Sequence, residues 1–400
     1  MRDLKRRDTK LQGLKRRETK CLIRLSLKRA VPALLLLGSF FASPGVEARA
    51  ADWAQAVTLY QKGDYRAALG EFQAVIKDQP DAAGAWYYIG ICEFKLKRYK
   101  QAELPLSHAI DLLEVQSPGS EDISGAWYTI GFSHYLVGEF DKAVDSLKNY
   151  IDIQAKAGRK IDANARRALG RSYFFLDRYD EAMPLLAEAK PGDVSSDQAG
   201  DANADSYYIG AIYFKKGDDD RAVKSLQTAL EAKPGDVAAM DLLAESLIRK
   251  AQSPKTSSAN EYWLKAAECG ENLKKLSDDL TTASILGRAY FGARDFEKAL
   301  PSIEKVAKAK PDDGQWWLYY GIALSRTGQT RKAEEALEMT IQLTPNSIPA
   351  LSELAYVYES NKQYDQALRV YEKAYAAGGS ADASIKQSID RVRALGSPQH

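Results

Sequence analysis

The 400-residue sequence is poor in the side chains that most often build catalytic or metal centres. It contains three histidines, three cysteines and four methionines. The histidines are His108, His134 and His400, and none of them belongs to an HExxH-type helical zinc motif. A histidine-rich metal centre or a histidine-dependent proton relay is therefore not expected.

The motifs of several common enzyme classes are also missing. The sequence has no GxSxG elbow, no phosphate loop and no dinucleotide-binding fingerprint. Two acidic clusters, 218–220 and 312–313, lie at predicted turns, where carboxylates cap the free N–H groups of helix N-termini. We therefore expect a non-enzymatic protein that needs no cofactor and no metal.

Positive charge is scarce once the first fifty residues are set aside. Those fifty residues carry 13 Lys and Arg against 4 Asp and Glu, whereas the rest of the chain carries 43 against 50. A protein whose main partner is DNA or RNA is expected to show the opposite balance. Nucleic acid is therefore not an expected partner.

Long apolar runs are missing too. The most apolar stretch, Val31–Ala42, has roughly a dozen residues and is too short to span a bilayer comfortably. A basic segment precedes it, and Ala48 and Ala50 supply the small residues that signal peptidase accepts. We expect residues 1–50 to be a signal peptide, cleaved before Ala51, and the mature protein to be exported to the periplasm. The alternative is an uncleaved signal that anchors the protein in the membrane.

The sequence after Ala51 is dominated by a repeat with two parts. In the first part, an aromatic or long side chain precedes an aliphatic residue and a small one, at 86–90, 127–131, 206–210 and 317–321. In the second part, a turn leads to an aromatic residue and then an alanine, at 63–68, 97–102, 138–143, 177–182, 294–299 and 362–367. The small residues are Ala56, Gly90, Gly131, Gly170, Gly210, Ala244, Gly287, Gly321 and Ala355, and four of their eight intervals are 34 residues.

Each part of the repeat has the spacing of a helix that buries one stripe. The aliphatic residue, the small residue and a tyrosine three positions later fall on one face of a first helix. A glycine or alanine there lets a second helix approach closely. One such hairpin cannot bury both of its faces, so neighbouring hairpins must stack. The longer intervals, of 39 to 43 residues, predict longer loops, and Pro105, Pro184 and Pro301 are expected near the first turn of their helices.

These patterns resemble the tetratricopeptide repeat, in which W-x2-L-G-x2-Y, A-x3-F and P recur about every 34 residues. The resemblance covers nearly the whole chain after Ala51. It implies an all-α, right-handed solenoid of about nine helix–turn–helix repeats that binds other proteins in a concave groove. We expect repeats 1–4 in 51–200, repeats 5–9 in 201–379 with a lengthened hairpin near 251–259, and a capping helix and tail in 380–400.

The resemblance also implies which side chains face the groove. In the amino-terminal half they are aromatic or cationic: Tyr60, Tyr87, Phe94, Lys95, Tyr128, Phe132, Tyr135, Arg167, Arg171, Phe174, Tyr207, Phe214 and Lys215. Such a lining suits an extended peptide with apolar side chains and a carboxylate. In the carboxyl-terminal half the lining is charged and mixed: Asp241, Glu245, Arg249, Arg288, Arg326 and Glu359. The alternative is that the aromatic rings pack between neighbouring helices.

Together these features predict a non-enzymatic scaffold of the bacterial cell envelope. It is expected to bind partner proteins in its groove and to assist the assembly of an envelope complex. Two alternatives remain open. Rows of aromatic rings also stack on sugars, which would suit a glycan- or peptidoglycan-associated adaptor. A repeat array can also assemble with itself.

Overall fold

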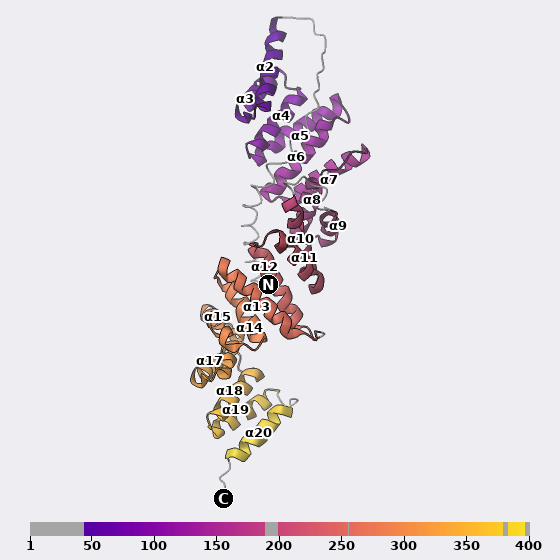
Figure 1. The fold of residues 1–400 in the computed structure, drawn as a ribbon. Coiled ribbons are helices and arrows are strands. Elements are labelled where there is room, and N and C mark those ends of the chain that lie inside the picture. The colour runs from indigo at the N-terminus through magenta and orange to yellow at the C-terminus, as the bar shows by residue number, and fades with distance from the viewer. Residues whose placement is uncertain (1–43, 189–198, 255, 379–382, 397–400) are drawn as a thin grey trace. The chain divides into compact units, whose positions relative to one another are not determined.

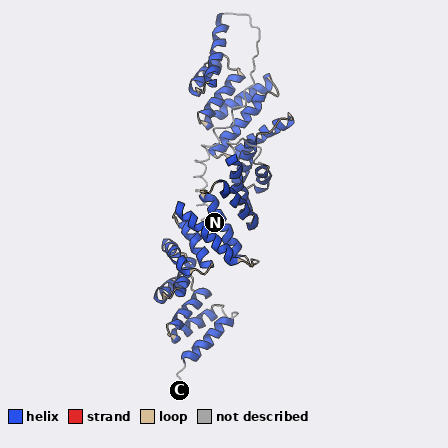
Figure 2. Cartoon of the chain, in the orientation of Figure 1, coloured by secondary structure: helices blue, strands red, loops and turns tan. Residues whose placement is uncertain are grey.

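The computed structural model describes residues 44–188, 199–254, 256–378 and 383–396. These residues form nineteen helices and no strand (Figure 2). The predicted all-α array of helical hairpins is confirmed. Within the described residues, no helix combines the length and the hydropathy that crossing a membrane requires. The signal segment predicted for residues 1–50 lies almost wholly outside the described part of the chain.

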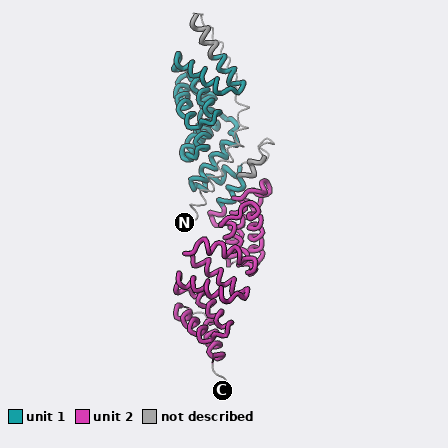
Figure 3. The backbone as a smooth tube through the Cα atoms, turned by 90° about the vertical axis from the view of Figure 1, so that its left-hand side faces the viewer, with its two compact units in different colours: residues 1–212 teal, residues 213–400 magenta. Residues whose placement is uncertain are grey.

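The chain divides into two compact units, residues 1–212 and 213–400 (Figure 3). In order along unit 1 are α2 (Pro44–Gln61), α3 (Tyr65–Asp78), α4 (Ala83–Lys95), α5 (Tyr99–Gln116), α6 (Glu121–Val137), α7 (Phe140–Lys156), α8 (Ala163–Phe175), α9 (Tyr179–Ala187) and most of α10 (Ala199–Lys215). Consecutive helices form hairpins, and each hairpin packs on the next through contacts such as α5 with α6 and α7 with α8 (Figure 1).

Unit 2 repeats the same arrangement. It contains α11 (Asp219–Ala232), α12 (Val237–Gln252), α13 (Ala259–Leu276), α14 (Leu280–Gly292), α15 (Phe296–Ala309), α16 (Gly314–Arg326), α17 (Thr330–Leu343), α18 (Ile348–Ser360), α19 (Tyr364–Ala376) and α20 (Ala383–Gly396). Helix α20 packs on α19 and buries Ile385, Ile389 and Val392. An apolar face of the last hairpin is thereby covered.

Glycines of the repeat sit where two helices of a hairpin touch. A Cβ atom on Gly90 would lie 2.3 Å from Cγ of Leu106, and one on Gly321 would lie 2.6 Å from Cγ of Leu337. Both distances are shorter than real Cβ contacts, so the second helix can reach its observed position only beside a glycine. This is the role that the repeat pattern predicts for the small residue.

Acidic residues begin many of the helices. The carboxylate of Asp218 accepts a hydrogen bond from the backbone N–H of Arg221 at 3.0 Å, and that of Asp313 accepts from Gln315 at 3.1 Å. These side chains satisfy N–H groups that have no partner inside the helix. The capping role predicted for the acidic clusters 218–220 and 312–313 is confirmed at these two positions.

The extra residues between Gly90 and Gly131 lengthen helices instead of a loop. Helix α4 has 13 residues, whereas α5 has 18 and α6 has 17, and only four residues separate α5 from α6. The prediction of a longer loop here was wrong. Helix α5 continues because Glu114, Val115 and Gln116 are compatible with a helix, and the first residue that stops it is the one before Pro118.

The three prolines lie deeper in their helices than predicted. Pro105, Pro184 and Pro301 are all inside α5, α9 and α15, in the second turn and not the first. The missing proline N–H therefore removes a hydrogen bond within each helix. In α5 the ring is buried, so packing at Pro105 offsets part of that loss.

Candidate protein-binding surface

The first helix of each hairpin is called its A helix and the second its B helix. Neighbouring A helices of unit 1 contact one another directly, α4 with α6 and α6 with α8. Side chains on this side of consecutive hairpins therefore share one continuous surface. Tyr60 on α2 contacts Tyr88 on α4, and Arg171 on α8 pairs with Asp205 on α10, so these two helices adjoin the same surface. The groove positions predicted from the sequence lie on α2, α4, α6, α8 and α10, and those within residues 60–207 are called the A-helix face of unit 1.

Most of the predicted positions are partly accessible. Lys215 is exposed, and the half-buried ones are Tyr60, Tyr87, Phe94, Lys95, Tyr128, Tyr207 and Phe214. The ring centroid of Tyr128 lies 4.6 Å from that of Phe132 and 5.1 Å from that of Tyr150. These contacts hold the Tyr128 ring in place while part of it stays accessible.

Burial changes the proton affinity of this surface. It raises the pKa of the hydroxyls of Tyr60 and Tyr87, and the nearby Asp122 carboxylate adds to the rise at Tyr87. Both hydroxyls therefore stay protonated and can donate hydrogen bonds at neutral pH. Burial lowers the pKa of Lys95, whose Nζ lies 5.7 Å from the centroid of the Tyr65 ring. A carboxylate bound there would compensate part of the desolvation of the ammonium.

Three of the predicted aromatics are buried. Phe132, Tyr135 and Phe174 keep only 6%, 8% and 8% of their surface exposed. The ring of Phe174 lies edge-on to Tyr208 on α10, with centroids 5.1 Å apart. At these three positions the rings pack within unit 1, as the packing alternative describes. A role for them in binding stays a prediction.

The two predicted arginines of α8 face a carboxylate of this chain. Nε and Nη2 of Arg171 donate to Oδ1 of Asp205 at 3.0 and 2.8 Å. Nε of Arg167 lies 2.8 Å from Oδ2 of Asp205, but the N–H is not aligned for a hydrogen bond. All three side chains are at least 97% buried. Asp205 therefore occupies the position that the sequence assigned to a ligand carboxylate.

Sequence reasoning missed Asp205, although a signal was present. The two partners are 34 residues apart, which is one repeat period. An arginine and an aspartate at that separation face each other on successive A helices. The Arg171 guanidinium also lies 5.0 Å from the centroid of the Tyr208 ring, which further fixes it.

In unit 2 the charged positions are also paired within the chain. The pairs form the ion-pair row: Arg249–Asp219 at 2.7 Å, Arg288–Glu245, Arg326–Glu353 at 2.8 Å and Arg391–Glu359 at 2.7 Å. Three of these pairs join an A helix or α20 to an adjacent A helix. The sequence identified Arg249, Arg288, Arg326 and Glu359 as lining residues but did not identify Asp219, Glu353 or Arg391 as their partners.

Phe214 and Lys215 belong to the beginning of unit 2. The guanidinium of Arg249 lies 3.9 Å from the centroid of the Phe214 ring and donates to the Phe214 carbonyl oxygen at 2.8 Å. Part of the Phe214 ring is therefore covered by Arg249. Lys215 stays exposed at the end of α10.

Two of the three histidines lie in the described residues, and both pack against neighbours. His134 is buried, with Nδ1 3.2 Å from Glu139 and Nε2 3.5 Å from Glu103. His108 lies edge-on to Trp86, with ring centroids 4.7 Å apart. Across the described ranges, no three His, Cys, Asp or Glu side chains are grouped so as to hold a metal ion.

Comparison with known families supports the repeat pattern. Models of the tetratricopeptide repeat match residues 53–114 and 286–348, 206–236, and 350–379. These segments include hairpins of both units.

Individual relatives are distant and are matched only in part. The TPR repeat-containing protein YpiA of Bacillus subtilis is 22% identical over 198 residues, which are 43% of this chain and 47% of YpiA. DnaJ homolog subfamily C member 3 of Gallus gallus is 22% identical over 231 residues, which are 54% of this chain and 43% of that protein. The chain thus spans less than half the length of either curated relative.

Two solved structures are similar to less than half of this chain. MamA from MSR-1 is 23% identical, with a TM-score of 0.40, and the match covers 45% of this chain and 98% of MamA. YrrB, described as a TPR protein with an unusual peptide-binding site, is 14% identical, with a TM-score of 0.41 and coverage of 47% and 91%.

Proposed function

Because this chain is built from tetratricopeptide repeats, we propose that it is a non-enzymatic scaffold of the cell envelope that binds segments of partner proteins. The binding surface is the A-helix face of unit 1, and the bound segments belong to components of an envelope complex whose assembly the scaffold assists. The observation that carries the proposal is the series of half-buried tyrosines on four A helices: Tyr60 on α2, Tyr87 on α4, Tyr128 on α6 and Tyr207 on α10.

The chemistry of this face fits an extended peptide. Half-buried tyrosines offer partly accessible apolar ring surface, which suits the side chains of an extended segment. Lys95 adds a cation whose desolvation an anionic group would compensate. The basic and apolar segment in residues 1–50, with its small residues before Ala51, supports export and a partner in the periplasm.

A protein ligand fits this face better than a glycan. Rings that stack on sugars need a free flat face, but here rings meet one another edge to face. The planes of Tyr60 and Tyr88 cross at 69°, and those of Tyr128 and Tyr150 cross at 70°. Each such contact uses part of a ring face within the protein. A partner therefore meets only the exposed part of each ring and no wholly free ring face.

Site-specific photo-cross-linking in cells tests the proposal. Replacing Tyr87 or Tyr128 by p-benzoylphenylalanine keeps an aromatic ring at the position and adds a reactive carbonyl. The matched controls are Leu104 and Val115 on the B helix α5, whose side chains are 77% and 84% exposed. We expect an envelope protein to be captured from the two tyrosine positions and not from α5, as judged by mass spectrometry.

Two results would contradict the proposal. Equal capture from α5 and from the tyrosine positions would mean that the A-helix face has no special role. Capture of only a second copy of this chain would indicate self-assembly instead. Export is tested separately by sequencing the N-terminus of protein recovered from the periplasmic fraction, where a start at Ala51 is expected.

A further inference from the structure

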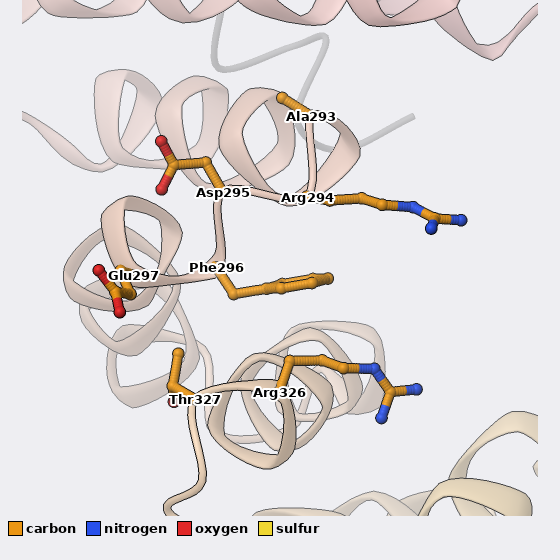
Figure 4. A pocket seen from close by; sticks show the side chains of 7 residues that line it. All are labelled: Ala293, Arg294, Asp295, Phe296, Glu297, Arg326 and Thr327. Carbon is orange, nitrogen blue, oxygen red and sulfur yellow. The ribbon is translucent and has the colours of Figure 1, made fainter.

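Unit 2 has an open pocket whose lining includes two arginines and a phenylalanine. It has a volume of about 470 Å³ and lies between the turn joining α14 to α15 and the end of α16 (Figure 4). Arg294 and Phe296 come from the turn and the start of α15, and Arg326 and Thr327 from the end of α16. The pocket is thus formed by two successive hairpins of one unit.

Charges of opposite sign point to opposite sides of this pocket. The guanidinium groups of Arg294 and Arg326 extend to the same side, with the Phe296 ring between them, whereas Asp295 and Glu297 point the other way (Figure 4). The Asp295 carboxylate is engaged by Lys298, whose Nζ lies 2.8 Å away and whose hydrogen bond lowers the pKa of Asp295. The side that holds the ring is therefore cationic.

Arg294 carries a charge that nothing in the described residues neutralises. Its side chain is exposed, and its guanidinium makes no ion pair or hydrogen bond within the described ranges. Its backbone has a φ of 60°, a left-handed conformation that is unfavourable for a side chain. The equivalent position of the next hairpin turn is Gly328, with a φ of 76°. The fold itself therefore does not need an arginine here.

Arg326 is held in place but keeps donors to spare. Its Nη1 and Nη2 donate to the two carboxylate oxygens of Glu353 at 2.8 and 2.9 Å. A guanidinium has five N–H donors, so this pair does not exhaust them. The exposed ring of Tyr356 lies 5.0 Å from the Arg326 guanidinium and extends the aromatic surface beside it.

We propose that this pocket is a second peptide-binding site, which takes an acidic side chain next to an apolar one. The carboxylate pairs with Arg294 and reaches a spare donor of Arg326, while the apolar side chain packs on the ring of Phe296. The inference rests on the proposed function in one respect: the ligand is again a segment of a partner protein. It differs in placing that segment on unit 2 and in specifying its charge.

A peptide fits this pocket better than a nucleic acid does. One unpaired guanidinium offers a single strong anion contact, whereas a nucleic acid backbone needs a run of cations. The chain after residue 50 is acidic, with 43 Lys and Arg against 50 Asp and Glu, and would repel a polyanion. A short acidic segment with one aromatic residue presents its charge locally and gains apolar contact with Phe296.

Fluorescence anisotropy with the full chain tests the proposal. The probe is a fluorescein-labelled peptide of nine residues, with one phenylalanine and four aspartates on each side of it. The comparison peptide has asparagines in place of the aspartates. We expect the aspartate peptide to bind, its affinity to fall with salt, and the asparagine peptide to bind at least about tenfold more weakly, because a charge-assisted hydrogen bond is lost.

The variant Arg294→Gly separates binding from folding. Glycine accepts the left-handed backbone without strain, so the thermal midpoint should be unchanged or higher, while the affinity for the aspartate peptide should fall about tenfold. The matched control is Lys362→Gly, which removes an exposed cation at the same kind of turn, with a φ of 60°, outside this pocket. Its affinity should equal that of the unmodified protein.

Three results would overturn the proposal: no salt-dependent binding of the aspartate peptide up to millimolar concentration, equal affinity for the two peptides, or full affinity in Arg294→Gly. The two proposals fail separately. Capture of a partner at Tyr87 or Tyr128 that persists in Arg294→Gly, without peptide binding, would overturn only the second site. Salt-dependent peptide binding without capture at the tyrosines would overturn only the first.

Discussion

At the scale of single residues, the small position of each A helix depends on what the B helix places opposite it. Ala56, Ala244 and Ala355 are fully buried at this position, so a methyl group is tolerated in some hairpins. In others the opposing leucine leaves no room, as at Gly90 and Gly321. Whether this position of the repeat accepts an alanine therefore depends on the hairpin in which it lies.

Gly90→Ala should destabilise the protein, whereas Gly70→Ala should stabilise it. The new methyl group at position 90 would overlap Leu106 and cost about 1–3 kcal/mol through overpacking. Gly70 lies inside α3 with nothing within 4 Å of a Cβ atom, so its replacement should gain about 0.5–1 kcal/mol from helix propensity. Chemical denaturation followed by circular dichroism measures both. If Gly70→Ala lowered the free energy of unfolding as much as Gly90→Ala does, the close-contact explanation would be contradicted.

Sequence patterns predicted the buried stripes well and the polar partners poorly. Stripes depend on spacing within one helix, so residues such as Gly90 and Gly131 could be identified from the chain alone. Arg171 was assigned to the groove because its helix was considered by itself. Its partner Asp205 lies on another A helix, and that pairing requires the packing of two hairpins. The burial of Phe174 against Tyr208 was unresolved for the same reason.

At the scale of elements, α20 is held by a pH-sensitive pair. Nε and Nη2 of Arg391 donate to the carboxylate of Glu359 on α18 at 2.7 and 2.9 Å, and this lowers the pKa of Glu359. A carboxyl group with a lowered pKa in the folded state stabilises that state above its unfolded pKa of about 4.3. The stabilisation is lost as the pH falls through the folded pKa.

Glu359→Gln should therefore matter at neutral pH and not in acid. We expect the variant to be less stable than the unmodified protein by less than about 1 kcal/mol at pH 7, because Arg391 is half exposed, and the difference to shrink as the pH falls below about 4. Thermal denaturation at both pH values measures it. Glu372→Gln serves as the control: it removes the carboxylate that pairs with Arg393, and Glu372 is more exposed than Glu359. Its stability should differ little from that of the unmodified protein at either pH. A difference for Glu359→Gln that persists at low pH would argue against the pair.

The lengths of elements were the least predictable part of the fold. An interval of 41 residues fixes how many residues are added but not whether they extend a helix or a loop. Residues 114–116 suit either outcome, and the structure places them in α5, where all three side chains are exposed. Helix starts marked by a capping aspartate, such as Asp313, could be located from the sequence.

At the scale of the whole molecule, a destabilising substitution should lower the stability of the hairpins near it and not that of the whole array. Each described helix contacts mainly its neighbours in sequence, so stability is approximately a sum over adjacent hairpins. Asp205→Asn would leave two buried arginines of unit 1 without a carboxylate, at a cost of about 3 kcal/mol. Gly321→Ala would overpack a hairpin of unit 2.

Hydrogen exchange measured by mass spectrometry should show this separation. We expect faster exchange in α8 for Asp205→Asn and in α16 for Gly321→Ala, with the other unit unchanged in each case. The double variant should show both changes at their original size, since distant sites add within about 0.5 kcal/mol. Faster exchange of α16 in the Asp205→Asn variant alone would mean that the two units unfold together.

The ion-pair row gives unit 2 a defined order of hairpins. All hairpins share one kind of apolar stripe, so apolar packing alone would allow one hairpin to be deleted, duplicated or exchanged. The ion pairs oppose such a change, because removing α16 and α17 would leave Glu353 buried on α18 without Arg326. Unequal recombination, to which internally repeated genes are prone, would thus yield chains with uncompensated buried carboxylates. The ion pairs of unit 2 therefore make otherwise similar hairpins non-interchangeable.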